Sequence, residues 1–204
     1  MILMPMGVLC DAKKICNRVH KCRSTLTLPF DWCQMNGESM VKVLNLSDSA
    51  IKPFWTTYLS NLNSNNKNKA TGSWFPHDFL KDKTTLKFES LEECIEKYSR
   101  RTRRMFYNLR LPEDKLLLSF FLSSLNKGNI ATVMLLKKCI EDTVPQATYI
   151  TINALSPKHS IPNHTDLSIN KSMDSDHNKL AVRALEKWGK DNTVLFKQTC
   201  EAEQ

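Results

Sequence analysis

The sequence predicts a single α+β domain, and three patterns lead to that fold class. Residues 91–109 repeat apolar side chains at helical spacing, and Ser90 with Glu93 forms a capping box at their start. Residues 116–122 are a continuous apolar run, which is typical of a buried strand. Residues 147–155 alternate polar and apolar side chains, as strands do. Helices and strands therefore alternate after residue 90, which indicates a mixed α and β class.

Length and composition favour one domain spanning residues 1–204. The chain is 41% hydrophobic, which is enough for one well-buried core. No stretch approaches the roughly 18 to 20 apolar residues that cross a bilayer. The seven cysteines are odd in number and irregularly spaced, so they argue against a disulfide framework and favour a reducing compartment. We therefore expect a soluble, cytoplasmic protein without a cofactor.

The other expected elements follow from local periodicity and turn residues. Before residue 90 we expect an extended segment ending in a turn at 24–33, a polar loop at 61–71, a short extended segment around His77, and helices at 10–19, 37–46 and 47–60. After residue 122 we expect a loop at 156–176, a strand at 193–198, and helices at 129–142 and 177–188.

One cysteine and one histidine point to chemistry rather than packing. Cys10 lies in the first turn of the helix expected at 10–19. The amino end of a helix carries a partial positive charge, which favours a thiolate over a thiol. A histidine delivered from elsewhere in the chain, such as His77, could take or return the proton. The two residues together predict a thiol nucleophile with a general base.

Three segments, taken in order, resemble a known family. The first has Gly7 and Cys10, with Ala12 one place earlier than the family pattern; the second is Pro-Phe-Asp-Trp at 29–32; the third is Phe-Pro-His-Asp-Phe at 75–79, followed by an Arg-rich helix. This ordered set resembles papain-like cysteine peptidases of a domain family found in bacteria and some viruses. The resemblance covers about residues 6–155, and residues 156–204 would be a C-terminal extension.

The resemblance implies a papain-like single domain, with an N-terminal helix carrying the cysteine, followed by a mixed sheet with packed helices. It also implies that Cys10 is the nucleophile and His77 the general base for a peptide or another amide. A third group should orient the imidazole. Asn153 is of a suitable type, although a strand-end asparagine often only makes a turn. Asp31 is a rival that fits better as a structural corner, accepting backbone N–H bonds. Asp78 is not expected to orient His77, because adjacent strand residues point to opposite faces.

Two other functions compete with this interpretation. The net charge of +8 includes an Arg-rich run at 100–104, which could bind an acidic partner or nucleic acid on a scaffold that has lost activity. The simpler interpretation of this run is the solvated face of a helix. A zinc site is the other alternative, but the chain lacks a Cys-x-x-Cys pair, so no metal site is predicted. Its potential ligands would be Cys10, Cys16, His20, Cys22 and Cys33.

Overall fold

The fold is taken from a computed structural model of the whole chain. It describes residues 2–5, 10–19, 27–79, 89–112, 115–121, 138, 142, 148–153, 165–168 and 177–193. Helices account for most of these residues.

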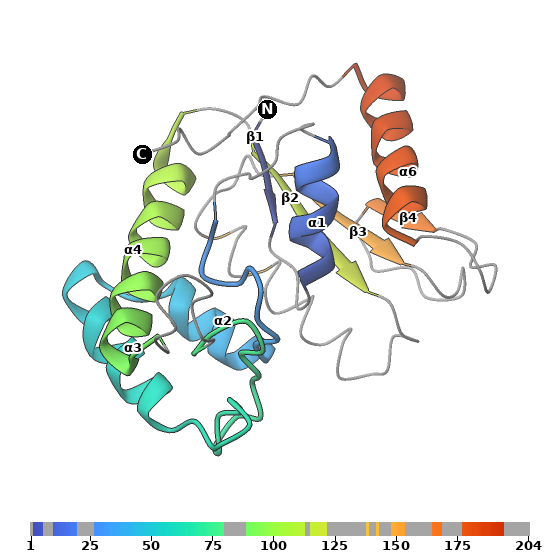
Figure 1. Cartoon of the computed structure of the whole chain (residues 1–204). Helices are drawn as coiled ribbons and strands as arrows, with labels where there is room; N and C mark the ends of the chain where they lie inside the picture. Colours follow the sequence, from blue (N-terminus) through green and yellow to red (C-terminus); the bar gives the residue numbers. More distant parts are fainter. Residues whose placement is uncertain are drawn as a thin grey trace.

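A parallel sheet stands beside a group of helices (Figure 1). Its four strands are β1 (Ile2–Pro5), β2 (Lys115–Phe121), β3 (Thr148–Asn153) and β4 (Thr165–Ser168). They are hydrogen-bonded in the order β1-β2-β3-β4, and each pair runs parallel. The chain therefore leaves every strand at the same edge of the sheet.

The predicted papain-like α+β fold with a mixed sheet is wrong. Every pair among the described strands is parallel, so no mixed sheet forms there, and helix outweighs strand in the described residues. Parallel strands need long connections, and the chain supplies them by placing many residues between successive strands. The sequence patterns did not reveal β1, whose four residues are too short for a periodicity to be recognised.

Most predicted helices are confirmed, and the capping box at Ser90 is present. The helices are α1 (Cys10–Val19), α2 (Gly37–Leu44), α3 (Ile51–Ser60) after a 3₁₀ turn at Asp48–Ala50, α4 (Leu91–Arg110) and α6 (His177–Asp191). Strands β2 and β3 are also confirmed. Strand β4 interrupts the predicted loop at 156–176. The expected helix at 129–142, apart from residues 138 and 142, and the strand at 193–198, apart from residue 193, lie outside the described residues.

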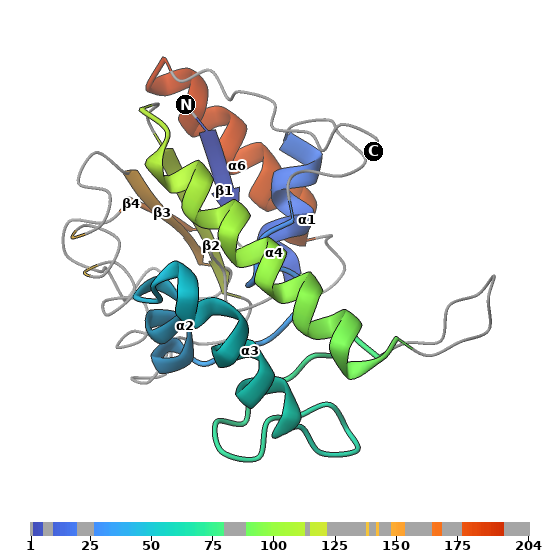
Figure 2. The same cartoon turned by 90° about the vertical axis from the view of Figure 1, so that its left-hand side faces the viewer.

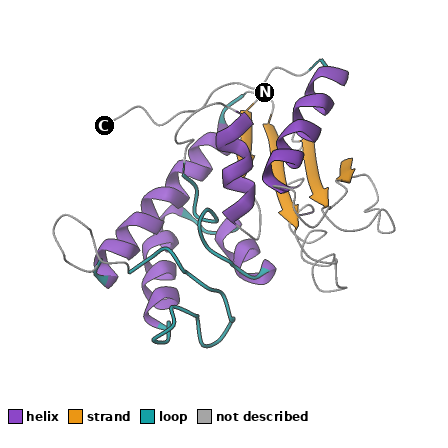
Figure 3. Cartoon of the chain, turned by 45° about the vertical axis from the view of Figure 1, so that its right-hand side comes forward, coloured by secondary structure: helices purple, strands orange, loops and turns teal. Residues whose placement is uncertain are grey.

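The helices form two groups. Helices α1 and α6 contact each other and lie against the sheet, as the view turned by 90° shows (Figure 2). Helices α2, α3 and α4 gather on the other side of the molecule (Figure 3).

Between α3 and α4 lies an aromatic core in which the centroids of the Trp55 and Tyr98 rings are 4.6 Å apart. Both side chains are fully buried.

Candidate functional site

The start of α1 is tied to the turn at residues 28–32 by a buried ion pair. Lys13 Nζ lies 3.3 Å from Asp31 Oδ2, and the two side chains are only 1% and 2% exposed. Lys13 is the fourth residue of α1, so it lies about one helical turn from the start of the helix. The ion pair therefore places the 28–32 turn beside the amino-terminal half of α1.

The turn itself is closed by two reciprocal hydrogen bonds. The Asp31 N–H donates to the Leu28 carbonyl over 3.1 Å, and the Leu28 N–H donates to Asp31 Oδ2 over 2.8 Å. Phe30 is buried at the same corner. The predicted structural role of Asp31, as an acceptor of backbone N–H groups, is confirmed. Burial raises the pKa of Asp31 from 3.8 to about 6, although Lys13 and the Leu28 N–H favour the ionised form.

His77 is held against this turn by an aromatic contact. The Trp32 and His77 rings meet edge to face, with centroids 5.6 Å apart and planes at 80°. His77 is exposed and lies in a turn at 76–79, so its expected extended conformation is wrong. Pro76 explains the difference, because proline fixes φ and favours turns. The imidazole is thus exposed to solvent while its ring contacts Trp32.

Two residues close to His77 have a strained backbone conformation. Trp32 has φ of 65° and Phe79 has φ of 60°, in the left-handed region that bulky side chains rarely enter. Such residues cost about 1 to 3 kcal/mol each and cluster at functional sites. The contact partner of His77 and a residue two positions after it both have this conformation. The strain marks the segment around His77 as a candidate site.

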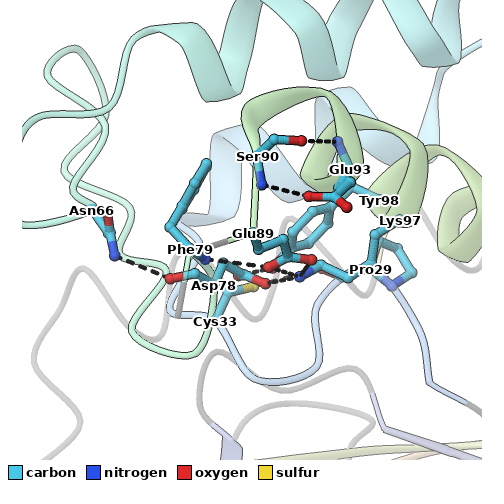
Figure 4. A network of polar contacts seen from close by, with 10 residues as sticks. All are labelled: Pro29, Cys33, Asn66, Asp78, Phe79, Glu89, Ser90, Glu93, Lys97 and Tyr98. Atoms are coloured by element: carbon cyan, nitrogen blue, oxygen red, sulfur yellow. Dashed lines mark hydrogen bonds and ion pairs between the residues drawn. The ribbon is translucent and has the colours of Figure 1, made fainter. Parts of the chain in front are cut away.

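Next to His77, Asp78 faces the interior and joins a polar network with α4 (Figure 4). The Tyr98 hydroxyl donates to Asp78 Oδ2 over 2.6 Å, and Lys97 Nζ lies 2.5 Å from Asp78 Oδ1. Asn66 donates its side-chain N–H to the Asp78 carbonyl. These contacts fix the turn that presents His77. The expectation that Asp78 does not orient the imidazole stays a prediction, and its reason does not apply because residues 76–79 do not form a strand.

The same network contains three potential metal ligands, but the positive charge that faces its two carboxylates comes from Lys97. Ligand atoms of Asp78, Glu89 and Cys94 lie within 4.8 Å of one another. Lys97 Nζ is 2.5 Å from oxygens of both carboxylates. Burial raises the pKa of Cys94 to about 12, which keeps its thiol protonated at neutral pH. Burial acts to raise the pKa of Glu89, but Lys97 holds it below its ordinary value. The arrangement is a complete ion-pair cluster.

Three cysteines other than Cys10 are made unreactive by burial. Cys16, Cys33 and Cys94 are free and buried. Burial raises the pKa of the Cys16 thiol well above its ordinary value, and the nearby Asp31 carboxylate raises it further. The Cys33 thiol donates to the Pro29 carbonyl over 3.6 Å. A thiolate is the reactive form, so these three residues are poor nucleophiles.

Two of the predicted catalytic residues, Cys10 and Asn153, lie at the ends of secondary-structure elements. Cys10 is the first residue of α1, as predicted, and Asn153 is the last residue of β3. In the sheet, Pro5 of β1 lies beside Leu118 of β2, which lies beside Ile150 of β3. Asn153 is three residues further along β3, so it lies at the edge of the sheet where the chain leaves β1 for α1. Strand β2 separates the two strands, which puts β3 about 10 Å from β1. The distances from the side chains of Cys10 and Asn153 to His77 lie outside what the structure describes.

The Arg-rich run at 100–104 is largely occupied by intramolecular contacts. It lies on α4, where Arg100 and Arg103 are exposed and Arg101 and Arg104 are half-buried. The contacts are Arg101 over the Tyr98 ring at 5.3 Å, Arg103 with Asp48 at 3.5 Å, and Arg104 with the Thr27 carbonyl at 3.4 Å. The predicted solvated helix face thus holds for Arg100 and Arg103, whereas Arg101 and Arg104 are half-buried.

Sequence reasoning missed Lys13, Lys97 and Trp32 as parts of this region. A signal for Lys13 was present, since it lies three residues before Cys16 and so falls on the apolar side of its helix. Lys97 lies one residue before Tyr98, and no local pattern shows that it reaches Asp78. The positive φ of Trp32 has no sequence signature, because this conformation is rare for tryptophan.

Comparisons with known proteins add no assignment: no family model, curated protein or solved structure matches this chain. Among the residues that the structure describes, no helix has the length and apolar character to cross a membrane.

Proposed function

We propose that this protein is a cysteine-dependent amide or acyl hydrolase in which Cys10 is the nucleophile and His77 the general base. The observation that carries the proposal is the chain of contacts from α1 to His77. Lys13 on α1 pairs with Asp31, and the adjoining Trp32 contacts the His77 ring. The sequence resemblance assigns the same two residues, and the proposal does not depend on a papain-like sheet.

The chemistry needs only groups that this chain contains. The Cys10 sulfur would attack the acyl carbon, forming a C–S bond while the C–N or C–O bond to the leaving group breaks. His77 would pass the thiol proton to the leaving group. Water would then attack the thioester, giving its proton to His77, and the C–S bond would break to release the acid and restore the thiol. Backbone N–H groups at the start of α1 would stabilise the oxyanion.

Asn153 stays a proposal as the group that orients His77. Its place at the carboxyl edge of the sheet supports it, because ligand sites of parallel sheets form outside this edge. The free, buried cysteines support a reducing compartment such as the cytoplasm. The rival function, binding of an acidic partner or nucleic acid at 100–104, has less support because three of its four arginines contact the protein itself.

The test is acylation by p-nitrophenyl acetate, an activated ester that suits a thiol of unknown specificity. Wild-type protein should release p-nitrophenolate and carry the acetyl group on Cys10, located by peptide mapping. Cys10→Ser should lose this thioester. His77→Ala should slow acylation at least about tenfold, because a positioned base contributes that much or more.

Matched variants separate this result from general thiol reactivity. Cys200→Ser and His159→Ala change the same residue types outside the proposed pair, and both should acylate at the wild-type rate. Circular dichroism should show that every variant is folded. The proposal fails if Cys10 is acylated no faster than Cys200, or if His77→Ala and His159→Ala behave alike.

A further inference from the structure

A cavity of about 470 Å³ lies between α2, α3 and the loop that follows α3. Its volume is in the range of sites that take small organic molecules. From α2, Ser39 and Lys42 line the cavity at a spacing that puts them on one side of the helix, and Leu46 lines it from the segment just after α2. On α3, Pro53, Phe54, Thr57 and Tyr58 repeat at helical spacing along the opposite wall, with Ala50 just before the helix and Asn61 just after it. The cavity therefore lies between two helix faces that turn toward each other.

One wall of the cavity is apolar and flat. The Phe54 and Tyr58 rings are stacked, with centroids 5.2 Å apart and planes at 21°. Phe54 is half-buried, so part of its ring is open to solvent. Leu46 and Ala50 are also half-buried, and Pro53 is exposed. Apolar side chains left partly open in a cavity are suited to the flat body of an aromatic ligand.

The other wall is polar. The Tyr58 hydroxyl lies 2.9 Å from Ser39 Oγ and 2.8 Å from both Thr71 Oγ1 and Ser73 Oγ. Asn68, which also lines the cavity, donates to the Tyr58 carbonyl over 2.7 Å. These bonds fix the hydroxyl groups in place, so the wall is formed before any ligand binds.

Lys42 gives the cavity its charge. It is exposed and is the one charged residue among those lining the cavity. Among the described residues its ammonium group has no hydrogen bond or ion pair, whereas Lys52 and Lys97 are both paired with carboxylates. A cation without a partner at an apolar cavity is complementary to an anionic head group.

We propose that this cavity binds a small aromatic carboxylate. Its ring would lie along Phe54 and Pro53, and its carboxylate would pair with Lys42. The site contains neither Cys10 nor His77 and does not depend on the proposed hydrolase function.

The test is calorimetric titration of the full chain with naphthoate and with its neutral analogue naphthamide. We expect naphthoate to bind saturably with one site per chain and naphthamide to bind at least tenfold more weakly. Lys42→Gln should weaken naphthoate binding about tenfold and leave naphthamide binding unchanged. Lys69→Gln, which removes an exposed lysine outside the cavity lining, is the matched control and should bind as the wild type does.

A second variant tests the apolar wall. Ala50→Trp adds a large ring at a half-buried position, so it should block the cavity and abolish naphthoate binding while the circular dichroism spectrum is kept. The proposal is overturned if the wild type does not bind naphthoate, if acid and amide bind equally, or if Lys42→Gln and Lys69→Gln have the same affinity.

Discussion

Lys13→Met should destabilise the protein much more at pH 8 than at pH 5. Lys13 is the cation that faces the buried carboxylate of Asp31, and methionine keeps much of its volume without the charge. Without Lys13, the ionised form of Asp31 is more costly, so its pKa moves above the wild-type value of about 6. Each unit of pKa shift is about 1.4 kcal/mol. The deficit of the variant relative to wild type should therefore grow by about 2 to 3 kcal/mol between pH 5 and pH 8.

The sign of the wild-type pH dependence follows from the same pKa. Asp31 has an ordinary pKa of 3.8 and a folded pKa of about 6, so between these values the folded state holds a proton that the unfolded state has lost. The contribution of Asp31 to the free energy of unfolding is thus largest below pH 4 and falls by about 3 kcal/mol as the pH rises to 6. Urea denaturation at four or five pH values measures both curves.

Two variants control this experiment. The double variant Lys13→Met/Asp31→Asn has neither charge, so this pair should contribute no pH dependence to its stability between pH 5 and pH 8. Lys14→Ala changes the next lysine, on the exposed side of α1, and should alter stability by less than about 0.5 kcal/mol. A Lys13→Met deficit that is constant from pH 5 to pH 8 would show that the charge of Asp31 does not depend on Lys13.

Local signals in the sequence predict the described helices and the two longer strands, β2 and β3, but not β1, β4 or the strand order of the sheet. Periodicity and a capping box gave α4 with nearly correct ends, because these signals act within a few residues. Strand direction is different, since it depends on which strands pair across long connections. The four-residue strand β1 pairs with β2 more than 100 residues later, and no local pattern carries that information. The family resemblance filled this gap with a papain-like mixed sheet, which was wrong.

In the candidate site too, local features could be predicted from the sequence and contacts between distant residues could not. The Pro-Phe-Asp-Trp segment predicted a corner at Asp31, because aspartate commonly accepts backbone N–H bonds in turns. Its partner Lys13 was missed because charged residues are normally placed at the surface in sequence reasoning. The contact of Trp32 with His77 also depends on tertiary structure. The sequence thus predicted the Asp31 corner, whereas its ion pair with Lys13 and the Trp32–His77 contact needed the fold.

Trp55→Ala should lower the free energy of unfolding by about 3 to 5 kcal/mol, as large-to-small changes of buried aromatic residues do. Trp55 is 0% exposed, and its ring lies 4.6 Å from Tyr98 and 5.2 Å from Phe54. Its indole N–H donates to Thr102 Oγ1 over 2.9 Å, which connects α3 to α4. Alanine would remove these contacts and leave a cavity between the two helices. Urea denaturation of wild type and variant measures the difference.

Trp55→Phe divides this effect into packing and hydrogen bonding. Phenylalanine keeps most of the apolar surface but cannot donate to Thr102, whose hydroxyl still donates to the Tyr98 carbonyl over 2.9 Å. We expect a loss of about 1 to 2 kcal/mol, well below that of alanine. Trp74 is the matched control, because it is 40% exposed and makes a cation–π contact with Lys67 at 5.8 Å. Trp74→Ala should cost less than about 1 kcal/mol. If Trp55→Ala and Trp74→Ala cost the same, or if Trp55→Phe costs as much as Trp55→Ala, the α3–α4 aromatic core is not the main source of stability on this side of the molecule.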